Sequence, residues 1–430
     1  MKLRFLGGAR EVGRSALLVD DRLLLDYGTL AGDPPRYPVD TPAPEAVVVS
    51  HGHLDHAGLL PALLAAEPRP PIHWTPPTRD LARLLARDTL KLRGGTYDCP
   101  FTEADLRRLG EVSHLHGYDE PFEPVPGYEV TFHDAGHVPG SAHVAVDDGD
   151  ERLLYTGDFH TDDRRGADGT SGRANGCGAP VSGQRLLSGT TARPDADVVV
   201  CESTYSDVSH DPRATVEERF AEALRETVWN GGTAVVPAFA IGRTQEVLLI
   251  CAAHDLDCYV DGMGKRVTRQ FLDNPSFLRD ADALREAAGR ARFVTNPGQR
   301  ERIARKNTVI VTTSGMLSGG PAMTYVPAIR GSPTNLVAMT GYQVEGTPGR
   351  ELLERGRAEF DGRVLPVSAR VEAFDFSAHA DREGLLAFLD AYRDARVLVN
   401  HGDRCAAFAA ELRADGYDAS APELGETVAV

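Results

Sequence analysis

The sequence has very few lysines, no paired cysteine motif and no long apolar run. Lysine and arginine together number 46 in 430 residues, and only four of them are lysine. The six cysteines form no CxxC pair, which argues against a zinc ribbon or a disulfide framework. No apolar run approaches the roughly 18 residues of a membrane span, and the N-terminus lacks a signal-peptide core. We therefore expect a cytoplasmic protein with no membrane association.

Acidic residues dominate the charge. Asp and Glu number 63, which gives a net charge of −17. This acidic, lysine-poor composition suggests a host rich in salt, a hypothesis that the salt dependence of folding and activity tests directly. A nucleic-acid binder usually carries a basic footprint, so the global charge argues against one unless a local basic surface overrides it. The length allows two domains.

The most informative stretch is SHGHLDH, residues 50–56. It follows a strand expected at 45–49 and precedes a helix expected at 57–66. His51 and His53, two apart in an extended chain, point the same way. The alternative to a metal site is a polar helix N-terminus with surface histidines, but a helix cap needs one Asp or Ser and no histidine. Catalytic zinc takes three protein ligands, so four candidate ligands in one segment suggest two metal ions.

Several further candidate ligands follow short strands rich in valine and leucine. The strand-end residues are Asp26, the cluster at 51–56, Asp158, Glu202 and His401. If these strands lie in packed sheets, their ends gather along one edge. Strand ends are rigid enough to hold a metal site.

The chain changes pattern at about residue 207. From there to about 312 strands alternate with helices, which predicts a parallel sheet flanked by helices. Ala240–Arg243 and Thr313–Met316 follow two of its strands, where open α/β sheets bind ligands. Before this region, residues 161–192 are rich in Gly, Ser, Arg and Asp, which predicts a long, mobile insertion.

A helix expected over 78–93 carries a basic stripe. Arg79, Arg83, Arg87 and Lys91 recur every four residues and so share one side of the helix. Two interpretations remain open, a solvated helix face and a ridge that contacts phosphates.

HGHLDH with Asp26, His137 and Asp158 resembles the metallo-β-lactamase signature. Glu202, the segment Phe376–His379 and the segment Asn400–Gly402 resemble the three extra motifs of the β-CASP nucleases. The opening GGAREVGRS, CESTY at 201–205, PAFAIGR at 237–243 and SGML at 314–317 resemble the archaeal and bacterial cleavage-and-polyadenylation-factor type, which is related to ribonuclease J. The resemblance covers nearly the whole chain.

The resemblance implies an α/β fold, a metallo-β-lactamase αββα sandwich interrupted by an inserted β-CASP domain that covers the metal site as a lid. We expect the metallo-β-lactamase domain at 1–206 and 375–430 and the β-CASP domain at 207–374. Archaeal relatives carry an N-terminal RNA-binding extension, and we expect none here because the chain starts at the first sheet strand.

The resemblance also implies two Zn²⁺ ions per chain. His51, His53 and His137 would hold one ion, and Asp55, His56 and His401 would hold the other. Asp158 would bridge them, and Asp26 would be a supporting carboxylate that fixes ligand histidines. This agrees with the count of ligands, which exceeds what one ion needs.

By the same resemblance, catalysis is by a two-metal-bound hydroxide, with Asp55 among the catalytic residues. His379 would protonate the leaving oxygen and Glu202 would orient it. Arg243, Ser314 and Gly315 are candidate substrate contacts, although a helix start or a tight turn would explain them equally well. The family's last motif more often reads VHGE, whereas residues 400–403 read NHGD here. The histidine is kept, so the difference puts in question only which neighbouring residues hold His401 in place.

These features predict a zinc-dependent ribonuclease that acts on single-stranded RNA, more as an endonuclease than as a 5′→3′ exonuclease. We also predict a homodimer. Three alternatives are a small-molecule hydrolase of the same fold, a DNA-acting β-CASP nuclease and an inactive RNA-binding scaffold. Glu202, His379 and His401 distinguish the nuclease from the small-molecule hydrolase, and the complete ligand set argues against the scaffold.

Overall fold

The structure, a computed structural model, describes residues 1–32, 34–96, 99–162 and 183–430. The chain forms two compact units. Unit 1 comprises Met1–Thr161, Gly189–Ser209 and His379–Val430, and unit 2 comprises Asp162–Ser188 and His210–Ala378. Residues 163–182 of the predicted insertion at 161–192 lie outside the described residues. The domain boundaries at 206/207 and 374/375 stay a prediction.

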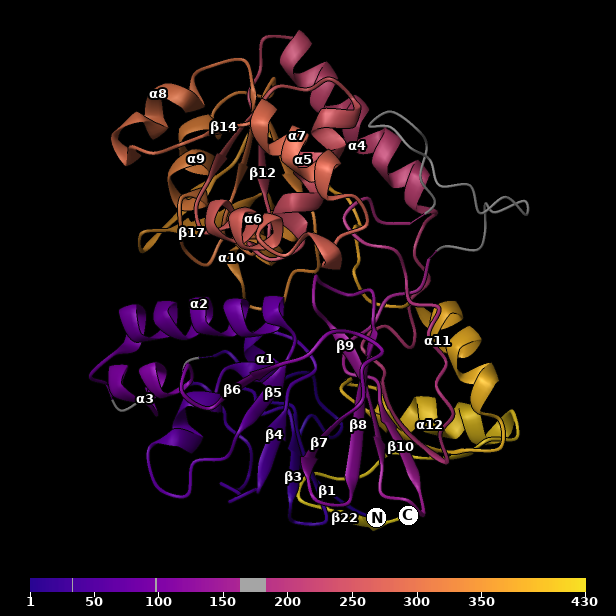
Figure 1. Cartoon of the computed structure of the whole chain (residues 1–430). Helices are drawn as coiled ribbons and strands as arrows, with labels where there is room; N and C mark the ends of the chain where they lie inside the picture. Colours follow the sequence, from indigo (N-terminus) through magenta and orange to yellow (C-terminus); the bar gives the residue numbers. More distant parts are fainter. Residues whose placement is uncertain (33, 97–98, 163–182) are drawn as a thin grey trace. The chain divides into compact units, whose positions relative to one another are not determined.

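Unit 1 contains two seven-stranded sheets. The first consists, in sheet order, of β22 (Thr427–Ala429), β1 (Lys2–Gly7), β2 (Ala16–Val19), β3 (Leu23–Leu25), β4 (Ala46–Val48), β5 (Ile72–Trp74) and β6 (Ser113–Leu115). The second consists of β21 (Asp418–Ser420), β20 (Arg396–Asn400), β11 (Val198–Glu202), β10 (Arg152–Tyr155), β9 (Ala142–Asp147), β8 (Tyr128–Asp134) and β7 (Phe122–Val125). Because β22 pairs with β1, the last strand of the chain completes the sheet that the first one begins (Figure 1).

Helices cover the outer faces of these sheets. They are α1 (Leu54–Ala57), the 3₁₀ helix η1 (Leu60–Leu64), α2 (Pro76–Arg93), α3 (Glu103–Arg108), α11 (Arg382–Leu389), η4 (Asp390–Tyr392) and α12 (Cys405–Ala414). The first four pack against the first sheet, and the last three pack against the second.

The core of unit 1 has three apolar layers because side chains alternate between the two faces of a strand. Leu3 and Phe5 of β1 lie between the sheets with Val144 of β9. Neighbouring positions face outward, and Leu18 of β2 packs against the first group of helices. In the second sheet Val199 of β11 packs in the same way against α11 and α12. This layering confirms the predicted αββα sandwich.

The helix predicted at 57–66 is wrong in its start and its type. Helix α1 already begins at Leu54, so Asp55 and His56 lie in a helical turn and not in a loop before it. The chain then continues as η1, which has Pro61 in its first turn. Proline lacks the backbone N–H that an α-helix interior requires, and this explains the break between the two short helices.

Unit 2 has a six-stranded sheet in which all pairings are parallel. Its strands, in sheet order, are β14 (Arg292–Phe293), β13 (Cys258–Asp261), β15 (Val309–Thr312), β12 (Ala234–Pro237), β16 (Leu336–Met339) and β19 (Arg370–Ala373), with a separate hairpin of β17 (Arg357–Phe360) and β18 (Arg363–Pro366). Its helices are α4 (Arg213–Trp229), α5 (Arg243–Ala253), α6 (Gly264–Leu272), η2 (Pro275–Phe277), α7 (Ala281–Arg290), η3 (Pro297–Gln299), α8 (Arg300–Ala304), α9 (Ala322–Ile329) and α10 (Pro348–Arg355).

One apolar core of unit 2 joins the sheet to its helices. Val235, Ile310 and Val337 of three adjacent strands pack against Tyr325 and Val326 of α9. The parallel pairing confirms the predicted α/β character of this region, since parallel strands need helical crossovers to return the chain. Among the described helices of the whole chain, none combines the length and the apolar character needed to cross a membrane.

Candidate metal centre

The predicted strand-end residues of unit 1 lie together at one edge of its two sheets. In the first sheet β3 pairs in parallel with β4, and in the second β10, β11 and β20 run parallel to one another. The carboxyl ends of parallel strands therefore reach a common edge. Residues that the sequence spreads from Asp26 to His401 become neighbours there.

The first group of candidate ligands consists of His51, His53, His137 and Asp158, whose ligand atoms all lie within 4.8 Å of one another. His53 Nδ1 lies 3.2 Å from His51 Nε2 and 3.2 Å from His137 Nε2. Asp158 Oδ2 is 3.6 Å from His51 Nε2 and 3.8 Å from His137 Nε2. Three ring nitrogens and one carboxylate oxygen thus converge on one point.

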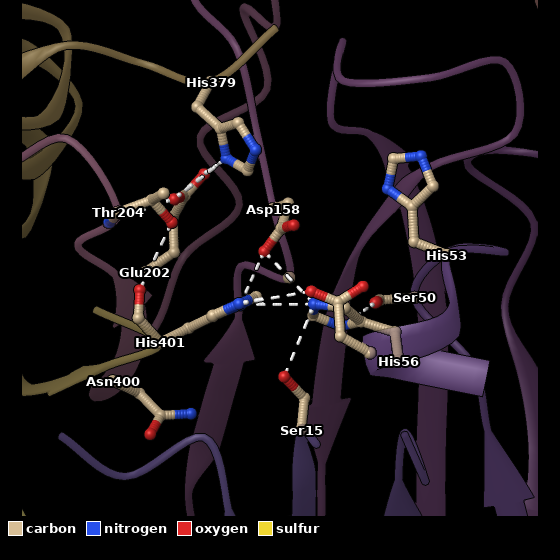
Figure 2. Close-up of polar contacts among 12 residues, drawn as sticks. Ser15, Ser50, His53, His56, Asp158, Glu202, Thr204, His379, Asn400 and His401 are labelled. Carbon is tan, nitrogen blue, oxygen red and sulfur yellow. Dashed lines mark hydrogen bonds and ion pairs between the residues drawn. The ribbon is translucent and has the colours of Figure 1, made fainter. Parts of the chain in front are cut away.

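The second group consists of Asp55, His56, Asp158 and His401, and it shares Asp158 with the first. Asp158 Oδ1 lies 2.8 Å from His401 Nδ1 and 3.3 Å from His56 Nε2. His401 Nε2 is 3.6 Å from Asp55 Oδ2. Figure 2 shows Asp158 directed toward His56 and His401. Each group matches one of the two ligand sets expected from the sequence, and Asp158 is common to both.

These residues fit a pair of zinc ions by two observations. Neutral imidazole and carboxylate are zinc ligands, and each group offers at least three of them. His401 Nε2 is buried and has no hydrogen-bond partner in the described part of the chain. Buried polar atoms are nearly always satisfied, so this nitrogen calls for a ligand that a metal ion would supply.

The electrostatics of the site favour a bound cation. Burial lowers the pKa of His51 well below its usual value, which keeps a lone pair available for a metal. Burial acts in the same direction on His56, but Asp158 and Asp26 outweigh it and raise its pKa well above the usual value. The carboxylates that favour a proton on His56 would equally favour a metal ion beside it.

Asp26 supports the site from beneath. It is fully buried and accepts hydrogen bonds from Ser50 N (2.7 Å), Ser50 Oγ (2.7 Å) and Tyr155 Oη (2.9 Å). Its Oδ2 is also 2.7 Å from His56 Nδ1, which leaves Nε2 of that ring directed at Asp158. The sequence analysis indicated Asp26 but did not identify Ser50 and Tyr155 as its partners. Both residues lie at or next to the end of a strand, which was the feature that could have indicated that they lie near the site.

Glu202 and His379 form a pair next to the first group. Glu202 Oε1 and Oε2 lie 3.1 and 3.2 Å from His379 Nδ1. Figure 2 shows the carboxylate of Glu202 directed at the His379 ring. Glu202 is buried and also accepts a hydrogen bond from Phe159 N at 2.8 Å, so its carboxylate is fixed. The ring centroid of His379 is 4.5 Å from that of His137. The sequence placed these residues 177 positions apart, and the fold brings them together.

The environment of His379 favours its protonated form. Burial acts to lower its pKa, but the charge and hydrogen bond of Glu202 outweigh it and raise the pKa to about 9. Cations bound nearby would shift this value down again, because they penalise a second positive charge. Such a residue can carry a proton at neutral pH and release it to a developing negative charge.

The backbone of His379 is held by a histidine that sequence reasoning missed. His160 Nδ1 donates a hydrogen bond to the carbonyl oxygen of His379 at 3.1 Å, and Ala380 N donates to Phe159 O at 2.8 Å. No local signal in the sequence points to the contact, because its partners lie 219 residues apart.

The three candidate substrate residues all lie in unit 2, at the carboxyl ends of its parallel strands. Arg243 begins α5 and is only 8% exposed, with its guanidinium 5.8 Å from the centre of the Phe376 ring. Ser314 Oγ accepts a hydrogen bond from Ser318 N at 2.9 Å. A Cβ on Gly315 would lie 3.0 Å from Phe239 N, which explains the glycine by close packing. Their role as substrate contacts stays a prediction.

Three family models match successive parts of the chain. The metallo-beta-lactamase superfamily matches residues 20–202, the Beta-Casp domain matches residues 245–352, and the Zn-dependent metallo-hydrolase RNA specificity domain matches residues 364–422. The first match lies mostly in unit 1 and the second lies in unit 2, whereas the third begins in unit 2 and continues through the C-terminal part of unit 1.

Curated relatives match over nearly the full chain. RNase aCSPSF2 of Saccharolobus solfataricus is 33% identical over 100% of this chain and 85% of its own length. Probable RNase MJ4 of Methanocaldococcus jannaschii is 30% identical over the whole of both chains. Transcription termination factor FttA of Pyrococcus abyssi is 31% identical over 100% of this chain and 71% of its own length.

A solved structure supports the fold independently. A crystal structure of a protein of unknown function from Enterococcus faecalis V583 superposes with a TM-score of 0.61 over 99% of each chain, at 12% identity. At that identity it shows the fold alone. Taken with the family models and the curated relatives, these findings establish that the chain belongs to the β-CASP group of the metallo-β-lactamase superfamily.

Proposed function

We propose that this protein is a zinc-dependent ribonuclease that cleaves single-stranded RNA internally. The observation that carries the proposal is the Glu202–His379 pair beside a site where two groups of ligands share Asp158. A hydrolase needs a nucleophile on one side of the phosphorus and a proton for the leaving oxygen on the other. This arrangement of side chains offers both.

In this proposal His51, His53 and His137 would hold one zinc ion, Asp55, His56 and His401 would hold the other, and Asp158, which belongs to both groups, would be a ligand shared by the two. When bound, the ions supply Lewis acidity, which makes water nucleophilic at neutral pH and balances charge on the phosphate. Asp26 fixes the His56 ring through its Nδ1 at 2.7 Å. Supporting carboxylates of this kind hold the ligand in one orientation and raise its basicity.

His379 delivers a proton to the leaving oxygen. Water oxygen forms the new bond to phosphorus, the bond to the leaving oxygen breaks, and the proton from His379 neutralises that oxygen. Glu202 holds the imidazolium in place through its contact with Nδ1, which directs Nε2 to the substrate. The Asp55 side chain is 30% exposed and so is accessible to the attacking water, whose proton it would accept.

RNA as the substrate is supported by the relatives, two of which are named RNases, and by the matching RNA specificity domain. The resemblance to the cleavage-and-polyadenylation-factor type supports single strands and internal cleavage. The predicted homodimer is tested separately by analytical ultracentrifugation of the zinc-loaded protein.

Circular single-stranded RNA tests the proposal sharply, because it has no end from which an exonuclease could start. We expect the zinc-loaded protein to open the circle and a chelator to abolish the reaction. Cleavage of linear RNA with intact circles would show an exonuclease. Matched DNA circles and a β-lactam substrate serve as controls. Faster turnover of either one than of RNA would contradict the proposed substrate.

A further inference from the structure

Helix α2 carries a concentration of positive charge in an acidic protein. Between Pro76 and Arg93 it has five basic and two acidic residues, whereas the chain as a whole has a net charge of −17. Arg79, Arg83, Arg87 and Lys91 follow one another at four-residue spacing, and we call them the α2 ridge. Figure 1 shows α2 as a long helix on the outer layer of unit 1.

Among the described residues, three of the four side chains of the α2 ridge have no charged or hydrogen-bonding partner. Arg79 pairs with Asp80, with Nη2 and Oδ1 2.7 Å apart. No ion pair or hydrogen bond within residues 1–32, 34–96, 99–162 and 183–430 involves the side chains of Arg83, Arg87 or Lys91, and the last two are exposed. Arg83 Nε is buried without an acceptor. A solvated helix face normally forms ion pairs at i±3 and i±4. Asp80 and Asp88 lie three residues before Arg83 and Lys91, but within the described residues neither carboxylate pairs with them, and Arg87 has no acidic residue at these spacings.

The start of α2 is fixed to two loops that carry candidate metal ligands. Thr75 Oγ1 and Thr78 Oγ1 donate hydrogen bonds to Gly140 O at 2.7 and 3.0 Å, three residues after His137. Gly52 lies between His51 and His53, and a Cβ there would lie 2.6 Å from Leu81 Cβ. The absent side chain lets α2 approach the ligand loop closely, so the ridge begins beside the metal centre.

The spacing of the ridge suits a chain of phosphates. Each step of four residues advances about 6 Å along the helix. This is close to the distance between successive phosphates of an extended single strand. We propose that the α2 ridge binds the phosphate backbone of single-stranded RNA on one side of the scissile bond, through Arg83, Arg87 and Lys91. The inference rests on the proposed function and adds the path of the substrate.

The test compares two triple variants of the zinc-loaded protein. Arg83→Gln, Arg87→Gln and Lys91→Gln together remove the ridge charges but keep part of each aliphatic stem. Arg393→Gln, Arg404→Gln and Arg413→Gln remove the same charge from exposed positions at or near α12, on the opposite outer layer of unit 1. Circular dichroism identifies the salt range in which all three proteins are folded.

The substrates are a dinucleotide, which reaches only the metal centre, and a longer RNA oligonucleotide. For the ridge variant we expect kcat/KM on the oligonucleotide to fall about tenfold or more, with the dinucleotide unchanged within about twofold. The slope of log affinity against log salt for the oligonucleotide should become shallower by about 2, since three phosphate contacts are lost. The control variant should resemble the wild type.

Two results would overturn the proposal. One is an oligonucleotide kcat/KM within about twofold of the wild type, and the other is an equal loss in the control variant, which would indicate general electrostatics. Failure of the proposed function is distinguishable, because the wild type would then cleave neither RNA. Fluorescence anisotropy with labelled oligonucleotide would still show whether the ridge variant binds RNA more weakly than the control.

Discussion

Each of the two units has an edge at which parallel strands end, and the two edges differ in chemistry. In unit 1 the strand ends carry histidines and carboxylates, which are mostly buried and in contact with one another. At the carboxyl edge of the unit 2 sheet lie the neutral Ser314 and the exposed Phe239 and Tyr342. The charged residues there, Arg243 and Asp261, are buried, and Asp261 forms an ion pair with Arg300. The carboxyl edge of parallel strands therefore carries a cluster of histidines and carboxylates in unit 1 and mainly neutral accessible side chains in unit 2.

We propose a division of labour between the two edges. Buried charged groups are costly unless they are paired or bind a metal, and those of the unit 1 edge converge on one point. Neutral, exposed groups cost little and suit contacts with a substrate that enters and leaves. We therefore expect substitutions at the first edge to reduce kcat and metal content, and substitutions at the second edge to raise KM.

The largest effect is expected from Asp158→Asn. The carboxylate is common to both ligand groups, so its loss weakens both ions at once. Loss of several kcal/mol of Lewis-acid stabilisation corresponds to a fall in kcat of at least about 10⁴-fold. Metal analysis should show fewer than two zinc ions per chain, whereas Asp195→Asn, whose side chain is 88% exposed, should retain them. An Asp158→Asn protein that retains two zinc ions per chain would contradict the proposed role of the unit 1 edge.

The next effect is expected from His379→Gln, with a fall in kcat of about a hundred- to a thousandfold on RNA. A substrate with a good leaving group needs no proton, so bis(p-nitrophenyl) phosphate should be hydrolysed at nearly the wild-type rate. His133→Gln is the matched control, because His133 is also 20% exposed and paired with a carboxylate, Asp119. Equal losses on both substrates, with loss of zinc, would make His379 a metal ligand instead.

A smaller effect is expected from Asp26→Asn. It replaces an acceptor of hydrogen bonds from Ser50 and Tyr155 by an amide that cannot accept all of them. Supporting groups of this kind change metal affinity by about 10–100-fold. Competition with a zinc chelator measures the change, and Tyr155→Phe, which removes one of the hydrogen bonds, should lie between Asp26→Asn and the wild type. Unchanged affinity in both variants would remove Asp26 from the metal centre.

These predictions also show what the sequence can establish. Most of the proposed metal ligands were identifiable because a strand end followed by His or Asp is a local pattern, found at Asp26, at residues 51–56, at Asp158 and at His401. His137 was indicated by the resemblance alone. Contacts across the fold left no such pattern. Tyr155 contacts Asp26 across 129 residues, and although both lie at strand ends, the sequence does not show that they are partners. The start of α1 at Leu54 was missed because the ligands themselves occupy its first turn.

The smallest effect is expected at the second edge, from Ser314→Ala. If its hydroxyl contacts substrate, loss of one hydrogen bond should raise KM about two- to tenfold and leave kcat unchanged. The hydroxyl also accepts a hydrogen bond from Ser318 N, so thermal unfolding must be compared with that of Ser332→Ala, a substitution of a serine whose Oγ pairs with Thr334 in an exposed turn. A fall in kcat at constant KM would place chemistry at this edge and contradict the division of labour, because a residue that only binds substrate stabilises ground state and transition state alike.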